Sequence, residues 1–159
     1  MIARPNRGWG MGLYGRVVLP RLLDKAMSGP EMDLLRKEAL APSRGRVLEI
    51  GFGTGLNVPH YPQGIESLAA LDPNPGMEAR ARERLRTASF PVEFQRGSGE
   101  ALPYPDGAFE TVVTTFVLCS LGDAPRALGE IRRVLAPGAT SCSSTGSPRS
   151  PPSRSGSTA

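Results

Sequence analysis

The sequence predicts an α/β fold in which helices alternate with the strands of a parallel sheet. Four short apolar runs, at residues 46–50, 67–71, 92–96 and 110–118, have the length of buried strands, and helical spacing recurs between them. A glycine-rich turn follows the first run, and an acidic residue follows the second. Alternating strands and helices of this kind form parallel sheets with helices on their faces. The 159 residues are enough for one domain.

The amino-terminal residues 1–43 are expected to form a helical lid region. Helices are predicted over Val17–Met27 and from Pro30 to about Leu40, since proline in the first helical turn costs no hydrogen bond. The apolar stripe of the second helix is expected to comprise Met32, Leu35 and Ala39. Apolar and arginine side chains mix near the amino end, so two interpretations remain open: a lid over a ligand site, which we favour, and a segment that lies on a membrane surface.

The first strand leads directly into the segment Gly51-Phe52-Gly53-Thr54-Gly55, with Glu49 two residues before it. Glycine permits positive φ angles and lacks a Cβ, so three alternate glycines predict a tight turn whose backbone approaches a ligand closely. The spacing is G-x-G-x-G, which differs from the dinucleotide fingerprint because Leu56 stands where that fingerprint has its third glycine. The turn also lacks the lysine of a P-loop.

The second strand ends at Asp72, which lies 21 residues after Gly51. This is the span that a strand–helix–strand unit needs to return to the same edge of a sheet. An acid at the tip of this strand can accept hydrogen bonds from both hydroxyls of a ribose. The glycine turn and Asp72 together therefore predict a ligand that contains a nucleoside.

Two further helices are predicted in the second half of the chain. One covers Pro75–Arg86 and is expected to bury Met77, Ala81 and Leu85. A polar loop of residues 97–109 separates the third strand from the fourth. Asp123 is expected to cap the last helix, which Pro137-Gly138 end. The inner face of this helix is predicted to comprise Ala127, Leu128, Ile131, Val134 and Leu135.

The sequence is basic, with a formal net charge of +4, but its charges are spread along the chain. The densest basic cluster lies on a predicted helix and is interrupted by acidic residues. We therefore expect a solvated surface rather than a phosphate-binding track, and no nucleic-acid partner. This cluster comprises Arg80, Arg82, Arg84 and Arg86.

The two cysteines, Cys119 and Cys142, are too few for a disulfide framework, and no secretory signal precedes them. No apolar run reaches the 18 residues or more that indicate a transmembrane helix. A cytoplasmic location is expected on these grounds. No cluster of histidine, cysteine and acidic residues has metal-ligand spacing, so no metal site is predicted. The oligomeric state does not follow from the sequence.

Four segments resemble, in the same order, the motifs of class I S-adenosylmethionine-dependent methyltransferases of the methyltransferase type 11 family. They are VLEIGFGTG, the acid of ALDPNPGM, GEALPYPDGAFETVV and EIRRVLAPG. The segments GTGLNVPHYP, DPNPGM and FVLCSL most resemble the thiol methyltransferase-like branch of this family. The resemblance implies a Rossmann-like, doubly wound parallel sheet, and it places an S-adenosylmethionine-binding core at residues 44–139.

The resemblance also implies roles for individual residues in binding S-adenosylmethionine. The turn would hold the methionine end of the cofactor, with Glu49 near its amino group, through Gly51, Gly53 and Gly55. Asp72 would bind the ribose hydroxyls, and Pro73 or Met77 would pack against the adenine.

The remaining roles implied by the resemblance concern the adenine amine and the acceptor. The family has an acid for the adenine amine where this chain has Ser98, followed by Gly99 and Glu100. Thr115 and Phe116, at the end of the fourth strand, would face the methyl group and the acceptor.

The predicted function is transfer of a methyl group to a small-molecule acceptor, either a thiol or an amine, with a lipid head group as a further alternative. Catalysis then consists mainly of alignment and desolvation. His60 and Tyr61 are candidate general bases if the acceptor arrives protonated, and the alternative is that they are ordinary loop residues. Two other functions stay open: a truncated, non-catalytic remnant that at most binds the cofactor, and an NAD-binding Rossmann protein, which the glycine spacing disfavours.

Residues 140–159 contain no Leu, Ile, Val, Phe or Met, and we expect them to be disordered. The family has an apolar fifth strand here. A shift of the reading frame by one base near Gly138-Ala139 would explain the difference. Each true codon would then join the last base of one written codon to the first two bases of the next. Where that next codon is a TC-type serine or a TG-type cysteine codon, the true codon has T in its middle position, and all codons of that kind encode apolar residues. We hypothesise that this tail is out of frame, which resequencing across codon 139 tests. On this hypothesis strands five to seven are missing, and the fourth strand is an unpaired edge.

Overall fold

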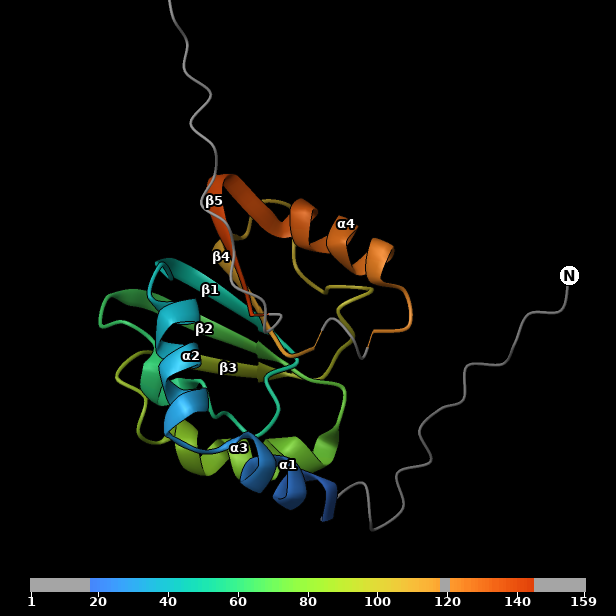
Figure 1. The fold of residues 1–159 in the computed structure, drawn as a ribbon. Helices are drawn as coiled ribbons and strands as arrows, with labels where there is room; N and C mark the ends of the chain where they lie inside the picture. The colour runs from blue at the N-terminus through green and yellow to red at the C-terminus, as the bar shows by residue number, and fades with distance from the viewer. Residues whose placement is uncertain (1–17, 118–120, 145–159) are drawn as a thin grey trace, which may run out of the picture.

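The computed structural model describes residues 18–117 and 121–144 (Figure 1). The described residues form one five-stranded sheet in which every neighbouring pair of strands is parallel. The strands are β1 Gly45–Ile50, β2 Ile65–Leu71, β3 Val92–Gln95, β4 Phe109–Thr115 and β5 Leu135–Ser144. The helices are α1 Leu19–Met27, α2 Pro30–Leu40, α3 Pro75–Leu85 and α4 Ala124–Val134, with a short 3-10 helix, η2, at Val58–His60.

Helices cover both faces of the sheet, as a parallel sheet requires. Neighbouring residues of β1 point to opposite faces, so Val47 belongs to one hydrophobic cluster and Leu48 to the other. The first cluster includes residues of α2 and α3, and the second includes residues of α4. Figure 1 accordingly shows α4 on one side of the sheet and the other three helices across from it. The predicted α/β class is confirmed.

The strand order is β3-β2-β1-β4-β5. The chain moves outward from β1 to β3 and then returns to the other side of β1 with β4. Parallel α/β sheets bind ligands outside the carboxyl ends of their strands, at the point where this direction reverses. In this sheet that point lies between the turn after β1, which begins at Gly51, and the residues after Thr115 of β4.

The prediction that the fourth strand is an unpaired edge is wrong. β4 pairs in parallel with β5, in a register that places Val113 opposite Cys142. Residues 140–144 therefore form part of a strand, although we expected disorder from residue 140 onward. The ladder is made by backbone groups and needs no apolar side chains, and Cys142 supplies a buried contact at 5% exposure. Residues 145–159 of the predicted tail lie outside the described residues, and the frame-shift hypothesis stays a prediction.

The predicted inner faces of two helices are corrected by the structure. In α2 the buried residues are Arg36 and Leu40, whereas Leu35 is 42% exposed. In α4 Leu128 is 54% exposed, while its predicted neighbours Ala127, Ile131 and Val134 are buried. Helical spacing alone does not fix which of two adjacent stripes faces the sheet. The faces predicted for α3 and the cap at Asp123 agree with the structure, since Asp123 accepts a hydrogen bond from the amide of Arg126.

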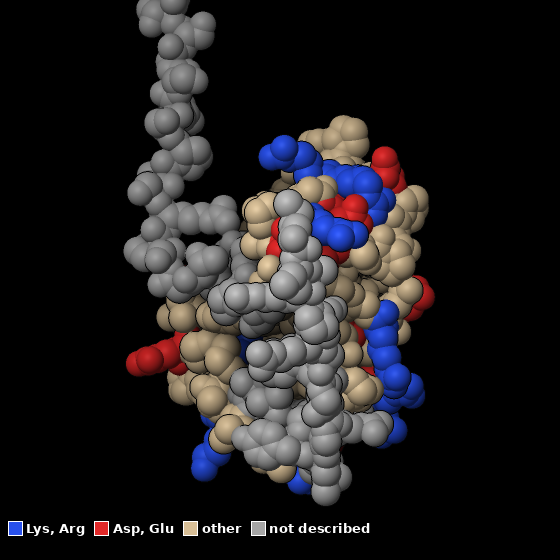
Figure 2. Space-filling model, turned by 90° about the vertical axis from the view of Figure 1, so that its right-hand side faces the viewer, with Lys and Arg blue, Asp and Glu red and all other residues tan. Residues whose placement is uncertain are grey.

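The charged side chains do not form a continuous basic stripe on the face that Figure 2 shows. Lys and Arg lie there in separate groups, with acidic or uncharged atoms between them. No helix of the described residues is long and apolar enough to cross a membrane. Within the described ranges, no group of three or more His, Cys, Asp or Glu side chains could hold a metal ion.

Candidate functional site

A cavity of about 380 Å³ opens at the carboxyl ends of β1, β2 and β4. Its volume is in the range of small-molecule binding sites. Most residues predicted to bind a ligand line this cavity, although they come from distant parts of the sequence. They are Glu49, Gly51, Gly53, Asp72, Pro73, Met77, Ser98, Gly99, Thr115 and Phe116.

Four residues predicted for the site do not line the cavity. Gly55 lies behind the turn, where an added Cβ would meet the ring of Phe52 at 3.2 Å. Glu100 accepts a hydrogen bond from the amide of Asp123 and so supports the start of α4. His60 pairs with Asp33 at 3.3 Å. The hydroxyl of Tyr61 donates to the carboxylate of Glu49 at 2.7 Å.

The glycine turn is built as the sequence predicts, with φ angles of 73° at Gly51, 59° at Gly53 and 82° at Gly55. These angles lie in the left-handed region, which glycine adopts without strain. A Cβ at Gly51 would lie 2.3 Å from a methyl carbon of Val117, so the residue after β1 packs directly against the segment after β4. A Cβ at Gly53 would meet only the Gly51 carbonyl oxygen, at 3.9 Å. The space in front of Gly53 is therefore open to a ligand.

Asp72 lies at the end of β2 with 6% exposure, and its side chain lines the cavity. Its two carboxylate oxygens accept hydrogen bonds from the amides of Gly53 and Asn74, both at 2.8 Å. Burial raises the pKa of Asp72, although these two hydrogen bonds oppose the rise. The bond to Gly53 joins the acid of β2 to the turn after β1, so the two predicted ligand-binding features form one unit.

Glu49 lies at the end of β1, 1% exposed, and forms part of the cavity wall. The side-chain amide of Asn57 donates to one carboxylate oxygen at 2.6 Å, and Tyr61 donates to the other. Asn57 also donates to the hydroxyl of Thr115 at 2.8 Å, which links the ends of β1 and β4. Burial raises the pKa of Glu49 to about 7, although both hydrogen bonds and the charge of Arg36 oppose the rise.

The raised pKa of Glu49 predicts a loss of stability as pH rises. Between its ordinary pKa of 4.5 and about 7, the folded chain keeps a proton on Glu49 that the unfolded chain releases. The free energy of unfolding therefore falls with pH across this window, by on the order of 3 kcal/mol, and the loss is complete above it. The Glu49→Gln variant cannot ionise and should lack this part of the decline. Urea unfolding of both proteins at about pH 5 and pH 8 checks this, and the same pH dependence in both would contradict it.

The sequence profile of a methyltransferase domain matches residues 48–142, which is more than half of the chain. The chain belongs to this methyltransferase domain family. The match begins in β1 and ends in β5, so it contains the glycine turn, Asp72 and the residues after β4. The family resemblance stated from the sequence motifs is confirmed.

Individual methyltransferases are similar to this methyltransferase domain over much of its length. Demethylmenaquinone methyltransferase of Thermus thermophilus is 39% identical over 103 residues, which cover 63% of this chain and 46% of that protein. Thiol S-methyltransferase TMT1B of Homo sapiens is 33% identical over 132 residues, which cover 79% of this chain and 53% of that protein. The chain thus spans about half the length of the curated relatives it matches.

A solved structure gives the same result for the fold. A SAM-dependent methyltransferase of Thermotoga maritima superposes on this methyltransferase domain with a TM-score of 0.57 and 26% sequence identity. The superposition covers 77% of this chain and 55% of that chain. The Rossmann-like architecture expected from the motifs is therefore confirmed.

Met27, Arg36, Asn57 and Leu121 are among the residues of the cavity wall that the sequence did not reveal. Arg36 and Met27 come from the amino-terminal helices, which lie outside the family match. One signal could have indicated Arg36, because it lies four residues before Leu40 and so shares a helical stripe with this apolar residue. For Met27 and Leu121 the sequence offers no comparable signal.

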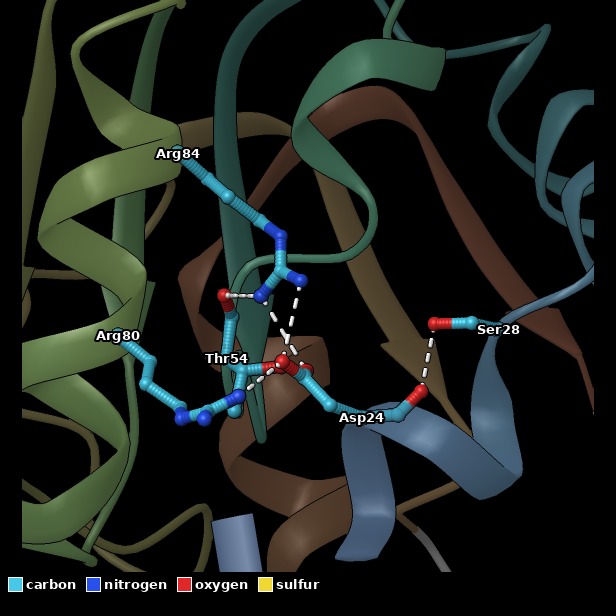
Figure 3. Close-up of polar contacts among 5 residues, drawn as sticks. All are labelled: Asp24, Ser28, Thr54, Arg80 and Arg84. Carbon is cyan, nitrogen blue, oxygen red and sulfur yellow. Dashed lines mark hydrogen bonds and ion pairs between the residues drawn. The ribbon is translucent and has the colours of Figure 1, made fainter. Parts of the chain in front are cut away.

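An ion-pair cluster attaches α1 to α3 and to the glycine turn. We call it the Asp24 cluster: Asp24 of α1, Arg80 and Arg84 of α3, and Thr54 of the turn (Figure 3). Asp24 pairs with Arg80 at 2.6 Å and with Arg84 at 3.1 Å, and it accepts a hydrogen bond from the hydroxyl of Thr54. Arg84 also donates to the carbonyl oxygen of Thr54 at 2.7 Å.

The Asp24 cluster corrects the prediction of a solvated arginine surface. Burial would raise the pKa of Asp24, but hydrogen bonds from Arg84 and Thr54 outweigh it and lower this pKa. Arg82, by contrast, is 72% exposed and pairs only with Glu78 among the described residues. Helical spacing explains the difference, because Arg80 and Arg84 are four residues apart and share a face that Arg82 does not.

Replacement of Asp24 by alanine should loosen α1 from the rest of the domain. The change leaves two partly buried guanidinium groups without their carboxylate, so we expect the free energy of unfolding to fall by about 1–3 kcal/mol. Hydrogen exchange of the α1 amides should become faster, and trypsin should cleave sooner after Lys25. Asp106→Ala is a matched control, because Asp106 is 80% exposed and its ion pair with Arg133 should contribute little. Equal hydrogen-exchange protection of the α1 amides in the wild type and the Asp24 variant would refute the attachment of α1 through Asp24.

Proposed function

We propose that this methyltransferase domain binds S-adenosylmethionine in the cavity after β1 and transfers its methyl group to a small-molecule acceptor. The observation that carries the proposal is the convergence of Asp72 and the open turn at Gly53 on one cavity, joined by a hydrogen bond of 2.8 Å. The similarity to the SAM-dependent methyltransferase of Thermotoga maritima supports the choice of cofactor.

The residues present fit this cofactor. Asp72 offers a buried carboxylate to ribose hydroxyls, and the space that a Cβ of Gly53 would occupy is open. Met77, 7% exposed, and Pro73 provide apolar wall for an adenine ring on the β2 side. Glu49 offers a carboxylate oxygen to the amino group of the methionine part.

The bound cofactor would supply a methyl group on a sulfonium, which is already a good leaving group. The residues after β4 would then hold the acceptor in line and exclude water, which is the main work left to the protein. We assign this role to Thr115 and Phe116, together with Val117, because all three line the cavity at the carboxyl end of β4.

A thiol is the acceptor that we propose first. The described part of the cavity wall contains no histidine, cysteine, lysine or tyrosine, so His60 and Tyr61 do not reach the acceptor position in this structure. A thiol ionises near pH 8.5 and therefore supplies its own nucleophile more readily than an ammonium group or an alcohol does. The similarity to a thiol S-methyltransferase of Homo sapiens supports the same choice. An amine acceptor, including a lipid head group, is the alternative.

α1 and α2 are proposed to act as the lid of this site. Met27 at the end of α1 and Arg36 of α2 both line the cavity, and the Asp24 cluster holds α1 beside the turn. Residues 1–17 of the predicted lid lie outside the described residues.

Transfer of labelled methyl groups tests the function directly. S-adenosylmethionine with a labelled methyl group is incubated with the protein and with a small aliphatic thiol, or with the amine of the same carbon skeleton. We expect labelled thioether to form and the amine to be labelled much more slowly. Label in the amine alone would overturn the thiol assignment.

A second candidate is a domain that binds the cofactor without transferring its methyl group. The observation in its favour is that the chain spans about half the length of the curated relatives it matches. Binding of S-adenosylhomocysteine without label in any acceptor would favour this candidate over the enzyme.

A further inference from the structure

Arg36 is a buried cation on the wall of the cavity. It belongs to α2, outside the family match, and is 3% exposed. A guanidinium group carries five N–H donors and stays protonated at every pH at which proteins fold. Burial of such a group is costly unless its charge and its donors find partners.

The described part of the chain gives Arg36 little compensation. Its one hydrogen bond there goes from Nη1 to the carboxylate of Asp33 at 3.5 Å, the outer limit for such a bond, and Asp33 is itself half exposed. Among the described residues, only Ser43 and Tyr104 have a fully buried side-chain nitrogen or oxygen atom without a hydrogen-bond partner. The unpaired N–H groups of Arg36 are therefore not enclosed in the core, and Arg36 forms part of the cavity wall.

Glu49 lies on the same wall with the opposite charge, close enough for each group to affect the other's pKa. No hydrogen bond joins Arg36 to Glu49 in the described structure, because the Glu49 oxygens accept from Asn57 and Tyr61 instead. Arg36 is thus not needed to satisfy Glu49. The wall of one cavity thus includes a cation and an anion, and each influences the pKa of the other.

We propose that Arg36 binds the α-carboxylate of the cofactor's amino-acid part, while Glu49 receives its α-amino group. The proposal rests on the proposed function and makes it more specific. A planar guanidinium matches a carboxylate through two parallel hydrogen bonds, which is the strongest pairing that this side chain makes. Arg36 then selects ligands that carry a complete amino acid over those that carry only the nucleoside and thioether.

Two ligands that differ in one group test the proposal. Calorimetric titrations compare S-adenosylhomocysteine with its decarboxylated analogue, which keeps the adenine, ribose, thioether and amine. We expect the wild type to bind the analogue roughly 10- to 100-fold more weakly. The Arg36→Met variant should bind S-adenosylhomocysteine more weakly by a similar factor, and its affinity for the analogue should hardly change. Arg36→Lys should keep part of the preference, since it retains the charge but not the planar fork.

Arg82→Met is the matched control, because Arg82 is 72% exposed and does not line the cavity, and both affinities should equal those of the wild type. Equal binding of the two ligands by the wild type would overturn the proposal, whether or not the Arg36 variants fold. An equal loss for both ligands in Arg36→Met would also overturn it, since Arg36 would then act through the fold. If the wild type binds neither ligand, the proposed function falls together with this assignment. If it binds both equally, only the assignment falls.

Discussion

Replacement of Asp72 by alanine is expected to weaken the binding of S-adenosylhomocysteine at least about 100-fold. Two hydrogen bonds from ribose hydroxyls to a buried carboxylate are each stronger than a neutral hydrogen bond, and alanine removes both. Alanine also takes away the acceptor for the amides of Gly53 and Asn74, so the turn loses the bond that holds it to β2. We therefore expect both direct and indirect loss of affinity, measured by calorimetric titration.

Two comparisons separate these causes for Asp72. Asp72→Asn keeps the size of the side chain and one acceptor oxygen, so its affinity should lie between those of the wild type and Asp72→Ala. Arg82→Ala removes an exposed charge outside the cavity wall and should leave the affinity unchanged. Wild-type affinity in a folded Asp72→Ala variant would show that the ribose is bound elsewhere.

Replacement of Gly51 by alanine is expected to lower the free energy of unfolding by about 2–5 kcal/mol. The φ angle of 73° costs a residue with a Cβ more than it costs glycine. The added Cβ would also lie 2.3 Å from a methyl carbon of Val117 and 2.7 Å from the Val117 Cβ. Rotation of the Val117 side chain does not move its Cβ, so it cannot relieve the overlap. Urea unfolding measures the loss.

Gly53→Ala provides a matched control for the Gly51 variant. Gly53 also lies in the left-handed region, with a φ of 59°, but its Cβ would meet only the Gly51 carbonyl oxygen, at 3.9 Å. The Gly53 variant should lose only the free energy that corresponds to backbone strain. The double variant Gly51→Ala, Val117→Ala removes the overlap and should recover about 1–3 kcal/mol. Equal losses at the two glycines would refute the close packing of the turn on the segment after β4.

The sequence was sufficient for the features that depend on local pattern. The glycine turn, the spacing to Asp72 and the carboxyl ends of β1 and β2 follow from strand periodicity and glycine chemistry. The ten predicted residues that line the cavity came from these features together with the family resemblance. The Asn57–Glu49–Tyr61 hydrogen bonds were not predicted, because they join segments that the sequence separates by turns of unknown direction.

Other features depend on how elements meet in space. Arg36 and Leu35 are neighbours in sequence, and only the docking angle of α2 decides that the arginine is buried and the leucine exposed. The pairing of β5 was missed for a different reason. Side-chain composition argued against a strand, but the backbone of residues 140–144 supplies the hydrogen bonds that β4 needs.

The central claim is that the cavity binds an adenosyl cofactor with an amino-acid end, and a single titration tests it most directly. The wild-type protein is titrated calorimetrically with S-adenosylhomocysteine and, separately, with NAD. We predict saturable binding of one S-adenosylhomocysteine per chain and no binding of NAD at the same concentrations. Binding of NAD without S-adenosylhomocysteine, or no binding of either by folded protein, would contradict the claim.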